Sequence, residues 1–159
     1  MGRRVFWEPK AVLVTGAGPI GLLGAVLGKQ LGLKVHVLDR TETGTKAELV
    51  RALGATYHTC SVANVGFEPD VILECTGGGQ VIDESLFTAG ASGVVCLTGV
   101  GHGGVMPKIA TADIASAAVL KNIMVFGSVN ANKRYWYKAA EALALADHSW
   151  LGRLITREC

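Results

Sequence analysis

The sequence has 159 residues, of which 50% are hydrophobic and 18% charged, and its formal net charge is +2. The charges are scattered, so nothing indicates a surface for nucleic acid or for an anionic membrane. No apolar run approaches the ~20 residues of a membrane-spanning helix and no secretory leader is recognised, so the expected location is the cytoplasm. We interpret the cysteines, which form no CxxC pair, as small hydrophobic residues in a reducing compartment. They are Cys60, Cys75, Cys96 and Cys159.

Apolar runs alternate with helical patterns along the chain. In chain order the patterns predict a strand at 11–14, a helix at 19–31, a strand at 35–38, a helix at 46–53 capped by Gly54, strands at 56–58 and 71–74, a helix at 81–88, a strand at 94–98, a helix at 112–120, a strand at 123–129 and a helix at 135–146. The nearly continuous apolar strands predict a parallel sheet that helices cover on both faces. Residues 1–159 are therefore predicted to form a single α/β domain with a Rossmann-type, doubly wound, six-stranded parallel sheet.

A glycine-rich turn, Gly16-Ala17-Gly18-Pro19-Ile20-Gly21, follows the first predicted strand and opens the first helix. In this context the first glycine permits a tight bend, the second lets the backbone approach a pyrophosphate, and the third lets helix and strand pack closely. The helix N-terminus then offers unpaired N–H groups to the phosphates, and Pro19 costs nothing there because its N–H would be unpaired anyway. The turn predicts a dinucleotide site, the alternative being a purely structural turn.

Asp39 ends the second predicted strand, close to the ~20 residues past the third glycine that are typical of a ribose-binding acid. A carboxylate there accepts hydrogen bonds from the ribose hydroxyls of adenosine and repels a 2′-phosphate, which favours NAD. The next residue, Arg40, is either a cofactor contact, stacking on adenine or pairing with a 2′-phosphate, or a solvated surface charge. NAD is therefore the expected cofactor, with NADP as the second candidate.

Three later strand ends run into glycine or small polar residues. Ligands of open α/β sheets lie outside the carboxyl ends of the strands, where the strand order reverses. Glycines at these ends leave space for the nicotinamide half of the cofactor, although asparagine is also an ordinary turn residue. The predicted contacts are Cys75, Thr76 and Gly77, then Thr98, Gly99 and Val100, and finally Ser128, Val129 and Asn130.

We find no credible catalytic group in the sequence. Hydride transfer to or from a carbonyl requires a group that polarises the oxygen, such as a zinc ion or a Tyr–Lys pair. The histidines have no ligand spacing with the cysteines, and only His102 falls in a loop near the predicted crevice. Tyr135 and Lys138 lie on the last predicted helix, away from the site, with the wrong spacing for a short-chain reductase. No metal site is predicted in this chain.

Several segments resemble the cofactor domain of the medium-chain, zinc-type alcohol dehydrogenase superfamily. They are Val14–Leu23, Glu74–Gly77 and Gly93–Gly99. Two further segments, Leu53–His58 and Val125–Asn132, are similar to the glucose 1-dehydrogenase branch. In that branch the asparagine matched by Asn130 lies near both nicotinamide and sugar. The likeness covers nearly the whole chain.

The resemblance implies that a GroES-like N-terminal domain, absent from this sequence, carries the catalytic zinc and most sugar contacts. The parent enzyme would oxidise glucose, or a related sugar or polyol, to the lactone with NAD(P), while this chain alone would bind dinucleotide and catalyse little. NADP users of the family often carry Asn or Gly with basic residues after the second strand, and Asp39 departs from that pattern. Sheet edges of this domain pair across a dimer in the family, which implies a homodimer or homotetramer.

Two alternatives to a dehydrogenase domain remain open. The first is a stand-alone module that senses dinucleotides without catalysis, such as the ligand-binding part of a regulated channel or repressor. The second is a methyltransferase, whose adenosine ligand also pairs with an acid after the second strand. The position of Gly21 and the apolar first helix argue against a methyltransferase.

Overall fold

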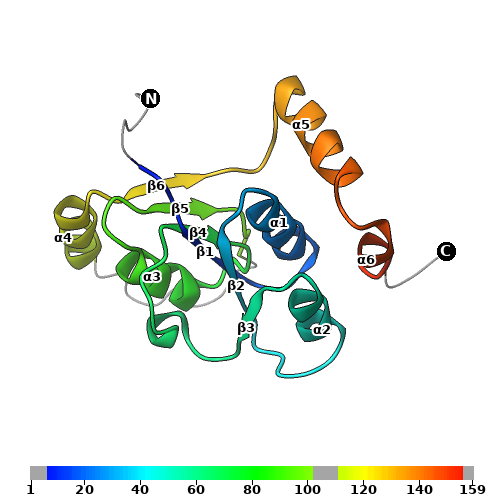
Figure 1. Ribbon diagram of the computed structural model, residues 1–159. Helices are drawn as coiled ribbons and strands as arrows, with labels where there is room; N and C mark the ends of the chain where they lie inside the picture. The colour runs from blue at the N-terminus through cyan, green and yellow to red at the C-terminus, as the bar shows by residue number, and fades with distance from the viewer. Residues whose placement is uncertain (1–6, 102–110, 156–159) are drawn as a thin grey trace.

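The computed structural model describes residues 7–101 and 111–155 and contains a six-stranded sheet in which every pairing is parallel. The strand order is β3-β2-β1-β4-β5-β6, which reverses direction between β1 and β4. Figure 1 shows this twisted sheet at the centre of the molecule. The strands are β1 (Ala11–Thr15), β2 (Lys34–Leu38), β3 (Thr56–His58), β4 (Val71–Glu74), β5 (Val94–Leu97) and β6 (Met124–Gly127). The predicted doubly wound fold and all of its strands are thus confirmed.

The helices follow the predicted alternation, with differences at their ends. They are α1 (Pro19–Gln30), α2 (Thr45–Ala52), the 3-10 turn η1 (Val62–Asn64), α3 (Gly79–Thr88), α4 (Thr111–Lys121), α5 (Lys133–Ala144) and α6 (His148–Gly152). The sequence predicted neither η1 nor α6. The last predicted helix, 135–146, instead ends at Ala144, and Asp147 caps a new helix by accepting the N–H groups of Ser149 and Trp150.

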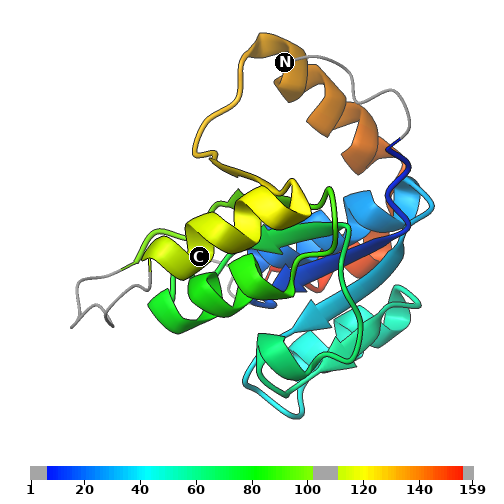
Figure 2. The ribbon, with the colours of Figure 1, turned by 90° about the vertical axis from the view of Figure 1, so that its left-hand side faces the viewer.

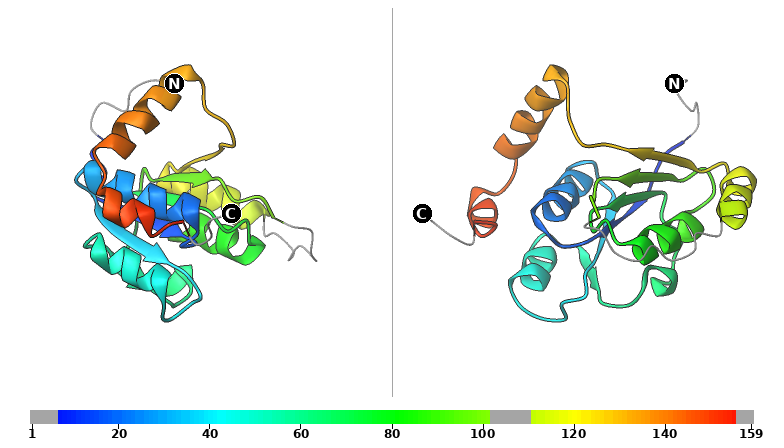
Figure 3. Two further views of the ribbon diagram at one scale, coloured as in Figure 1. Left: turned by 90° about the vertical axis from the view of Figure 1, so that its right-hand side faces the viewer. Right: turned by 180° about the vertical axis from the view of Figure 1, so that it is seen from behind.

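Alternating residues of the strands pack into two separate hydrophobic clusters, one on each face of the sheet. Val12 and Val14 of β1 belong to the cluster beneath α1 and α2, whereas Leu13 between them belongs to the cluster beneath α3. This division follows from the period of two in a strand, in which successive side chains point to opposite faces. Both faces are therefore covered, as Figures 2 and 3 show, which explains why the strands are apolar almost throughout.

Trp150 anchors the C-terminal end of the described chain to the α2 side of the sheet. Its side chain is 5% exposed, and its indole N–H donates to the carbonyl of Leu49 at 2.8 Å. Arg153 forms an ion pair with Glu48 of α2 at 3.2 Å. By contrast, α5 has no buried residue and stands away from the sheet in Figures 1 and 3. The short helix α6 therefore packs against the α2 side, whereas α5 contacts α1, where the Gln30 side-chain amide donates to the carbonyl of Ala142 at 2.8 Å.

The register of the sheet brings the ends of its strands into one row. Thr15 of β1 is paired with Leu38 of β2 and with Glu74 of β4, and Glu74 with Leu97 of β5. Leu97 is in turn paired with Gly127 of β6. Because the pairings are parallel, the loops that follow all leave from the same edge of the sheet. This carboxyl edge is where open α/β sheets bind their ligands.

A candidate dinucleotide site at the carboxyl edge of the sheet

The glycine-rich turn joins β1 to α1 and has the geometry that close backbone packing requires. Gly16 has φ +92°, in the left-handed region that favours glycine. A Cβ on Gly21 would overlap the carbonyl oxygen of Gly16, so helix and turn touch there without a side chain between them. At Gly18 an added Cβ would meet nothing within 4 Å. The turn is therefore tight at its two ends and open at its centre.

The N-terminus of α1 lies at this open part of the turn. Gly18 is the N-cap and Pro19 is in the first turn, and no side chain caps the helix. Its first-turn N–H groups therefore lack a side-chain acceptor and point toward any anion that lies on Gly18. Pro19 and Ile20 are exposed, the latter by 61%. A hollow of ≈ 250 Å³ opens beside Gly18 and Pro19, between the starts of α1 and α2, with Thr45 and Lys46 on its other side.

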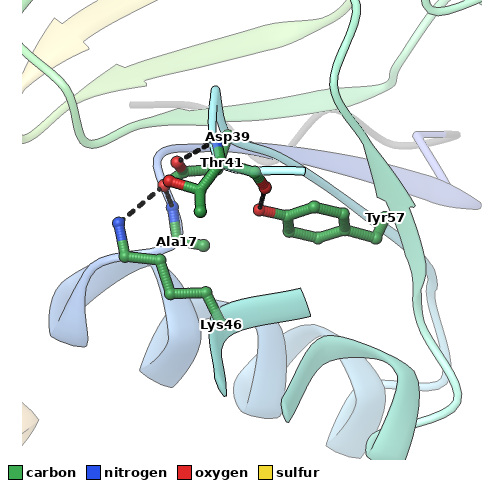
Figure 4. Close-up of polar contacts among 5 residues, drawn as sticks. All are labelled: Ala17, Asp39, Thr41, Lys46 and Tyr57. Atoms are coloured by element: carbon green, nitrogen blue, oxygen red, sulfur yellow. Dashed lines mark hydrogen bonds and ion pairs between the residues drawn. The ribbon is translucent and has the colours of Figure 1, made fainter. Parts of the chain in front are cut away.

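Asp39 follows β2 directly, and its carboxylate gathers three donors (Figure 4). Its Oδ2 accepts the N–H of Ala17 at 2.8 Å, which ties β2 to the glycine-rich turn. Its Oδ1 accepts the N–H of Thr41 at 3.1 Å, and the ammonium of Lys46 lies 3.1 Å from Oδ2. Burial alone would raise the pKa of Asp39, but the two backbone donors and the Lys46 ammonium outweigh it and hold that pKa below its ordinary value. Arg40 beside it is exposed.

Glu74 ends β4 at the point where the strand order reverses, and its side chain is fully buried. Its Oε1 accepts the N–H of Thr76 at 2.7 Å and the Thr76 hydroxyl at 2.5 Å. The N–H of Gly77 lies 3.1 Å from the same oxygen and 3.2 Å from Oε2. The Thr15 hydroxyl of β1 is a fourth, longer donor at 3.4 Å. Glu74 thus holds the loop after β4 against the end of β1, beneath the reversal point.

The loops after β4 and β5 are in direct backbone contact. A Cβ on Gly99 would overlap the backbone nitrogen of Gly77, and one on Gly77 would lie 2.6 Å from the nitrogen of Gly101. The N–H of Thr98 donates to the carbonyl of Glu74 at 2.8 Å. Two of the three predicted loop groups, residues 75–77 and 98–100, are therefore brought together by the fold. Val100 at the tip of the second is 72% exposed.

The cysteine in these loops, Cys75, is half-buried, as is Cys96 on β5, whereas Cys60 is exposed. Burial raises the pKa of Cys75, although the Thr98 hydroxyl, 3.3 Å from the sulfur, acts in the opposite direction. Burial also raises the pKa of Cys96 on β5. Cysteines whose pKa is raised are poor nucleophiles and poor metal ligands at neutral pH. Both therefore fit the interpretation as small hydrophobic residues.

The third predicted group, Ser128, Val129 and Asn130, lies at the same edge but apart from the other two loops. The N–H of Ser128 donates to the carbonyl of Leu97 at 3.0 Å, which continues the row of strand ends. Val129 is 85% exposed, and Asn130 is exposed as well. Among the described residues, no side-chain hydrogen bond joins this group to the loops after β4 and β5. These residues are thus placed on the expected edge without being drawn into the packed part of the site.

The fold brings together one pair of histidines whose separation in sequence gave no sign of contact. His36 Nδ1 and His58 Nε2 lie 2.9 Å apart, and the two rings stack with centroids at 5.1 Å. Phe67 packs against His36 with ring centroids 4.1 Å apart.

His102 lies outside the described residues. Within the described ranges, no group of three or more His, Cys, Asp or Glu residues could hold a metal ion. Likewise, no helix in those ranges is long and apolar enough to cross a membrane.

Three residues with structural contacts described above, Glu74, Lys46 and Trp150, were not predicted from the sequence. Glu74 stands as an acid at the end of an apolar strand, a signal that could have singled it out. Lys46 and Trp150 gave no such signal, because their partners, Asp39 and Leu49, are fixed by the tertiary fold. The predicted Tyr135 and Lys138 remain on α5, where the ammonium lies 5.8 Å from the tyrosine ring.

Known proteins resemble this chain over its full length. The family model described as glucose dehydrogenase C-terminus matches residues 1–159. Glucose 1-dehydrogenase 2 of Vulcanisaeta moutnovskia is 36% identical over 97% of this chain, and glucose 1-dehydrogenase 1 of Caldivirga maquilingensis is 35% identical over 98%. The chain spans 45% and 46% of the lengths of these two relatives, less than half of each.

A solved structure gives the same picture in three dimensions. Haloferax mediterranei glucose dehydrogenase in complex with NADP, Zn and gluconolactone superposes with a TM-score of 0.88 at 25% identity. The superposition covers 97% of this chain and 46% of that one. The six-stranded doubly wound sheet, the full-length family match and these relatives agree, and the chain belongs to the glucose dehydrogenase C-terminus family.

Proposed function

We propose that this chain binds NAD(P) as the cofactor domain of a zinc-dependent dehydrogenase that oxidises glucose or a related sugar or polyol. The observation that carries the proposal is the open turn at Gly18, with the Asp39 carboxylate hydrogen-bonded to the same turn through Ala17. An open backbone turn beside a carboxylate that could accept ribose hydroxyls is the arrangement that dinucleotide-binding sheets use. Family membership supports the same reading, as does the NADP and gluconolactone complex of the Haloferax relative.

Each half of the cofactor has its own set of residues in this proposal. The pyrophosphate lies on the N-terminus of α1, at Gly16, Gly18 and Gly21, and the adenosine ribose lies at Asp39 and Arg40. The nicotinamide half lies across the ends of β4, β5 and β6, where the packed loops 75–77 and 98–100 form a rigid floor. Residues 128–130 border that half. A bound nicotinamide would supply the hydride acceptor for the sugar, and these loops of the chain would orient it.

The described residues do not fit a zinc ion, so we assign them no step at the metal. We propose that the zinc and most sugar contacts belong to a catalytic domain that this sequence does not contain. The 159 residues would then bind dinucleotide but turn over no sugar on their own. Adding an excess of glucose and NAD(P) to the purified chain and following absorbance of the reduced cofactor tests this expectation. Measurable turnover by the chain alone would contradict it.

Calorimetric titration of the chain with NAD⁺, NADP⁺ and S-adenosylmethionine tests the cofactor assignment. Saturable binding of at least one dinucleotide, with weaker or no binding of S-adenosylmethionine, is the expected result. Tighter binding of the methyl donor would overturn the proposal and favour a methyltransferase-like site. In a Gly18→Val variant the side chain would occupy the open centre of the turn, so this variant should bind dinucleotide more weakly.

We also infer that β6 is the edge at which two copies of this chain associate. Among the described strands β6 pairs only with β5, so one of its edges carries unpaired backbone groups. Val125 and Phe126 on this strand are each 40% exposed. An apolar edge strand of this kind is commonly covered by a symmetric copy of itself. Sedimentation velocity over a range of concentrations should show a dimer or tetramer, and a monomer at the highest concentration would contradict the inference.

A further inference from the structure

Glu74 is hydrogen-bonded to both loops that border the proposed nicotinamide half of the site. Its carboxylate accepts the backbone N–H groups of Thr76 and Gly77 in the loop after β4. Its backbone carbonyl accepts from the loop after β5, where the N–H and the hydroxyl of Thr98 each lie at 2.8 Å and the N–H of Gly99 lies at 3.0 Å. One residue therefore joins the two loops to each other.

The position of the Glu74 side chain is closely determined. The side chain is fully buried, and the residue is paired with β1 on one side and with β5 on the other. A further donor, the Thr15 hydroxyl, reaches the carboxylate from a strand rather than from a loop. Moving a buried carboxylate away from its donors is costly, because both the charge and the donors would be left unpaired in the interior. The N–H groups of the loop are therefore held in place as well.

The loop after β4 lies so close to the loop after β5 that neither can shift alone. A Cβ on Gly77 would lie 2.6 Å from the nitrogen of Gly101, and one on Gly101 would lie 2.8 Å from the oxygen of Gly77. Gly77 also has φ +67°, a conformation that residues with a side chain rarely adopt. Because close-packed groups transmit a displacement rather than absorb it, a shift of Gly77 would also displace the second loop.

These contacts lie in one half of the sheet. A doubly wound sheet binds a dinucleotide across the crevice at its point of reversal, with one mononucleotide on each half. Here the reversal lies between β1 and β4. The glycine-rich turn and Asp39 follow β1 and β2 in the first half, whereas the two loops joined by Glu74 follow β4 and β5 in the second. The nicotinamide half of the cofactor should therefore depend on Glu74 more than the adenosine half does.

We propose that Glu74 is a positioning residue for the nicotinamide half of NAD(P). It holds the loops after β4 and β5 in the arrangement on which that half lies, and its buried side chain does not touch the cofactor itself. The inference rests on the proposed function, because it presupposes that a dinucleotide binds at this edge of the sheet. It gives Glu74 a role in binding beyond its contribution to stability.

The test is a calorimetric titration of the chain and of two variants, Glu74→Gln and Glu74→Asp, with NAD⁺ and with ADP. ADP keeps the adenosine and both phosphates but lacks the nicotinamide and its ribose. Glutamine keeps the size of the side chain but turns an NH₂ group toward the N–H of Gly77, whereas aspartate keeps the charge but is one methylene shorter. If the chain prefers NADP⁺, then NADP⁺ and 2′-phospho-ADP replace this pair of ligands.

Both variants should bind NAD⁺ about three- to tenfold more weakly, the scale of one lost hydrogen bond. Their affinity for ADP should stay within about twofold of that of the unsubstituted chain, which also shows that the variants are folded. Thr15→Val is the matched control, since it removes a donor to the same carboxylate but leaves both loops joined to Glu74. It should leave the ratio of the two dissociation constants unchanged.

A ratio in the Glu74 variants within about twofold of the unsubstituted chain, or equal to that of Thr15→Val, would overturn the positioning role while leaving dinucleotide binding intact. Weaker NAD⁺ binding in Glu74→Gln that Glu74→Asp does not share would overturn it too, because the charge of the side chain rather than its position would then be the cause. Failure of the unsubstituted chain to bind either dinucleotide would instead overturn the proposed function, and this inference with it.

Discussion

The Glu74 carboxylate accepts two hydrogen bonds from Thr76, one from the Thr76 backbone N–H at 2.7 Å and one from the Thr76 hydroxyl at 2.5 Å. The carboxylate is fully buried between the ends of β1 and β4, where the strand order reverses. A buried carboxylate is costly unless hydrogen bonds satisfy it, and here four donors do so. Its position therefore fixes the loop that is proposed to face the nicotinamide half of the cofactor.

Replacing Glu74 by glutamine should lower the free energy of unfolding by about 1–3 kcal/mol. The amide oxygen is a weaker, uncharged acceptor, and the amide NH₂ would face the N–H of Gly77. Urea denaturation followed by circular dichroism measures the difference. Glu68→Gln is the control, since the Glu68 side chain is 67% exposed and its ion pair with Lys121 is a surface contact. Equal stability of the two variants would contradict a stabilising role for Glu74.

Alanine substitution at two glycines of the turn should separate stability from binding: Gly21→Ala should lower stability, and Gly18→Ala should weaken NAD(P) binding. Gly21→Ala places a methyl group against the Gly16 carbonyl and should cost about 1–3 kcal/mol of stability, as overpacking does. Gly18→Ala meets no protein atom within 4 Å and should leave stability within about 0.5 kcal/mol. It should nevertheless weaken NAD(P) binding, because its methyl group enters the space proposed for the pyrophosphate. Thermal denaturation and calorimetry separate the two effects, and a destabilised Gly18→Ala would contradict the open geometry.

Trp150 should contribute far more to stability than Trp136. Trp150→Ala removes a 5% exposed side chain from the cluster beneath α1 and α2 and should cost about 3–5 kcal/mol. Trp150→Phe keeps most of the apolar surface but leaves the Leu49 carbonyl without its indole donor, so the loss should be smaller. Trp136→Ala, at a position 68% exposed on α5, should change stability by no more than about 0.5 kcal/mol. Urea denaturation of the variants gives the order directly.

Local patterns were sufficient to predict the sheet. Each strand is an apolar run of a few residues. The turn 16–21 can be recognised in the sequence because its backbone conformation requires glycine, as at Gly16 with its positive φ. The strand order follows from alternation of strands and helices in a doubly wound sheet. The ends of the helices were less predictable. No residue before Asp147 indicates that α5 ends and α6 begins, because Asp147 caps the residues that follow it.

Site residues could be predicted only where a motif fixes both the residue type and its spacing along the chain. Asp39 and the three glycines could be proposed as site residues because their spacing is typical of the fold. Lys46 could not, since an ion pair across seven residues depends on where α2 begins relative to β2. The contact of His36 with His58 was missed for the same reason, because it joins two strands that are neighbours only in the sheet. Tertiary pairing, rather than sequence spacing, decides such contacts.

Removing the carboxylate of Asp39 should weaken NAD⁺ binding more than NADP⁺ binding. Asp39→Ala takes away the proposed ribose acceptor, and it also removes the negative charge that repels a 2′-phosphate and pairs with Lys46. It also leaves the N–H groups of Ala17 and Thr41 without their acceptor, so some loss of stability should accompany the change. Titration with both dinucleotides, at a temperature where circular dichroism shows a folded chain, separates binding from stability. Equal weakening of both dinucleotides would contradict the ribose role.

The stacked pair His36 and His58 should make stability fall as the solution becomes mildly acidic. Burial is the main cause that lowers the pKa of each below its ordinary value of 6.5, and for His36 the charges of His58 and Lys34 add to it. Below about pH 6.5 the unfolded chain therefore binds more protons than the folded one, and the free energy of unfolding decreases as pH falls. The stabilisation is present above this value and is lost through the interval down to the lowered pKa values.

Urea denaturation at steps between about pH 7 and pH 5, above most carboxylate titration, measures this dependence. A His36→Gln, His58→Gln double variant should show a shallower slope of unfolding free energy against pH. His148→Gln removes an exposed histidine at the start of α6 and should keep the slope of the unsubstituted chain. If the double variant and the unsubstituted chain have the same slope, the paired histidines do not cause the acid sensitivity, and their contact is one of packing alone.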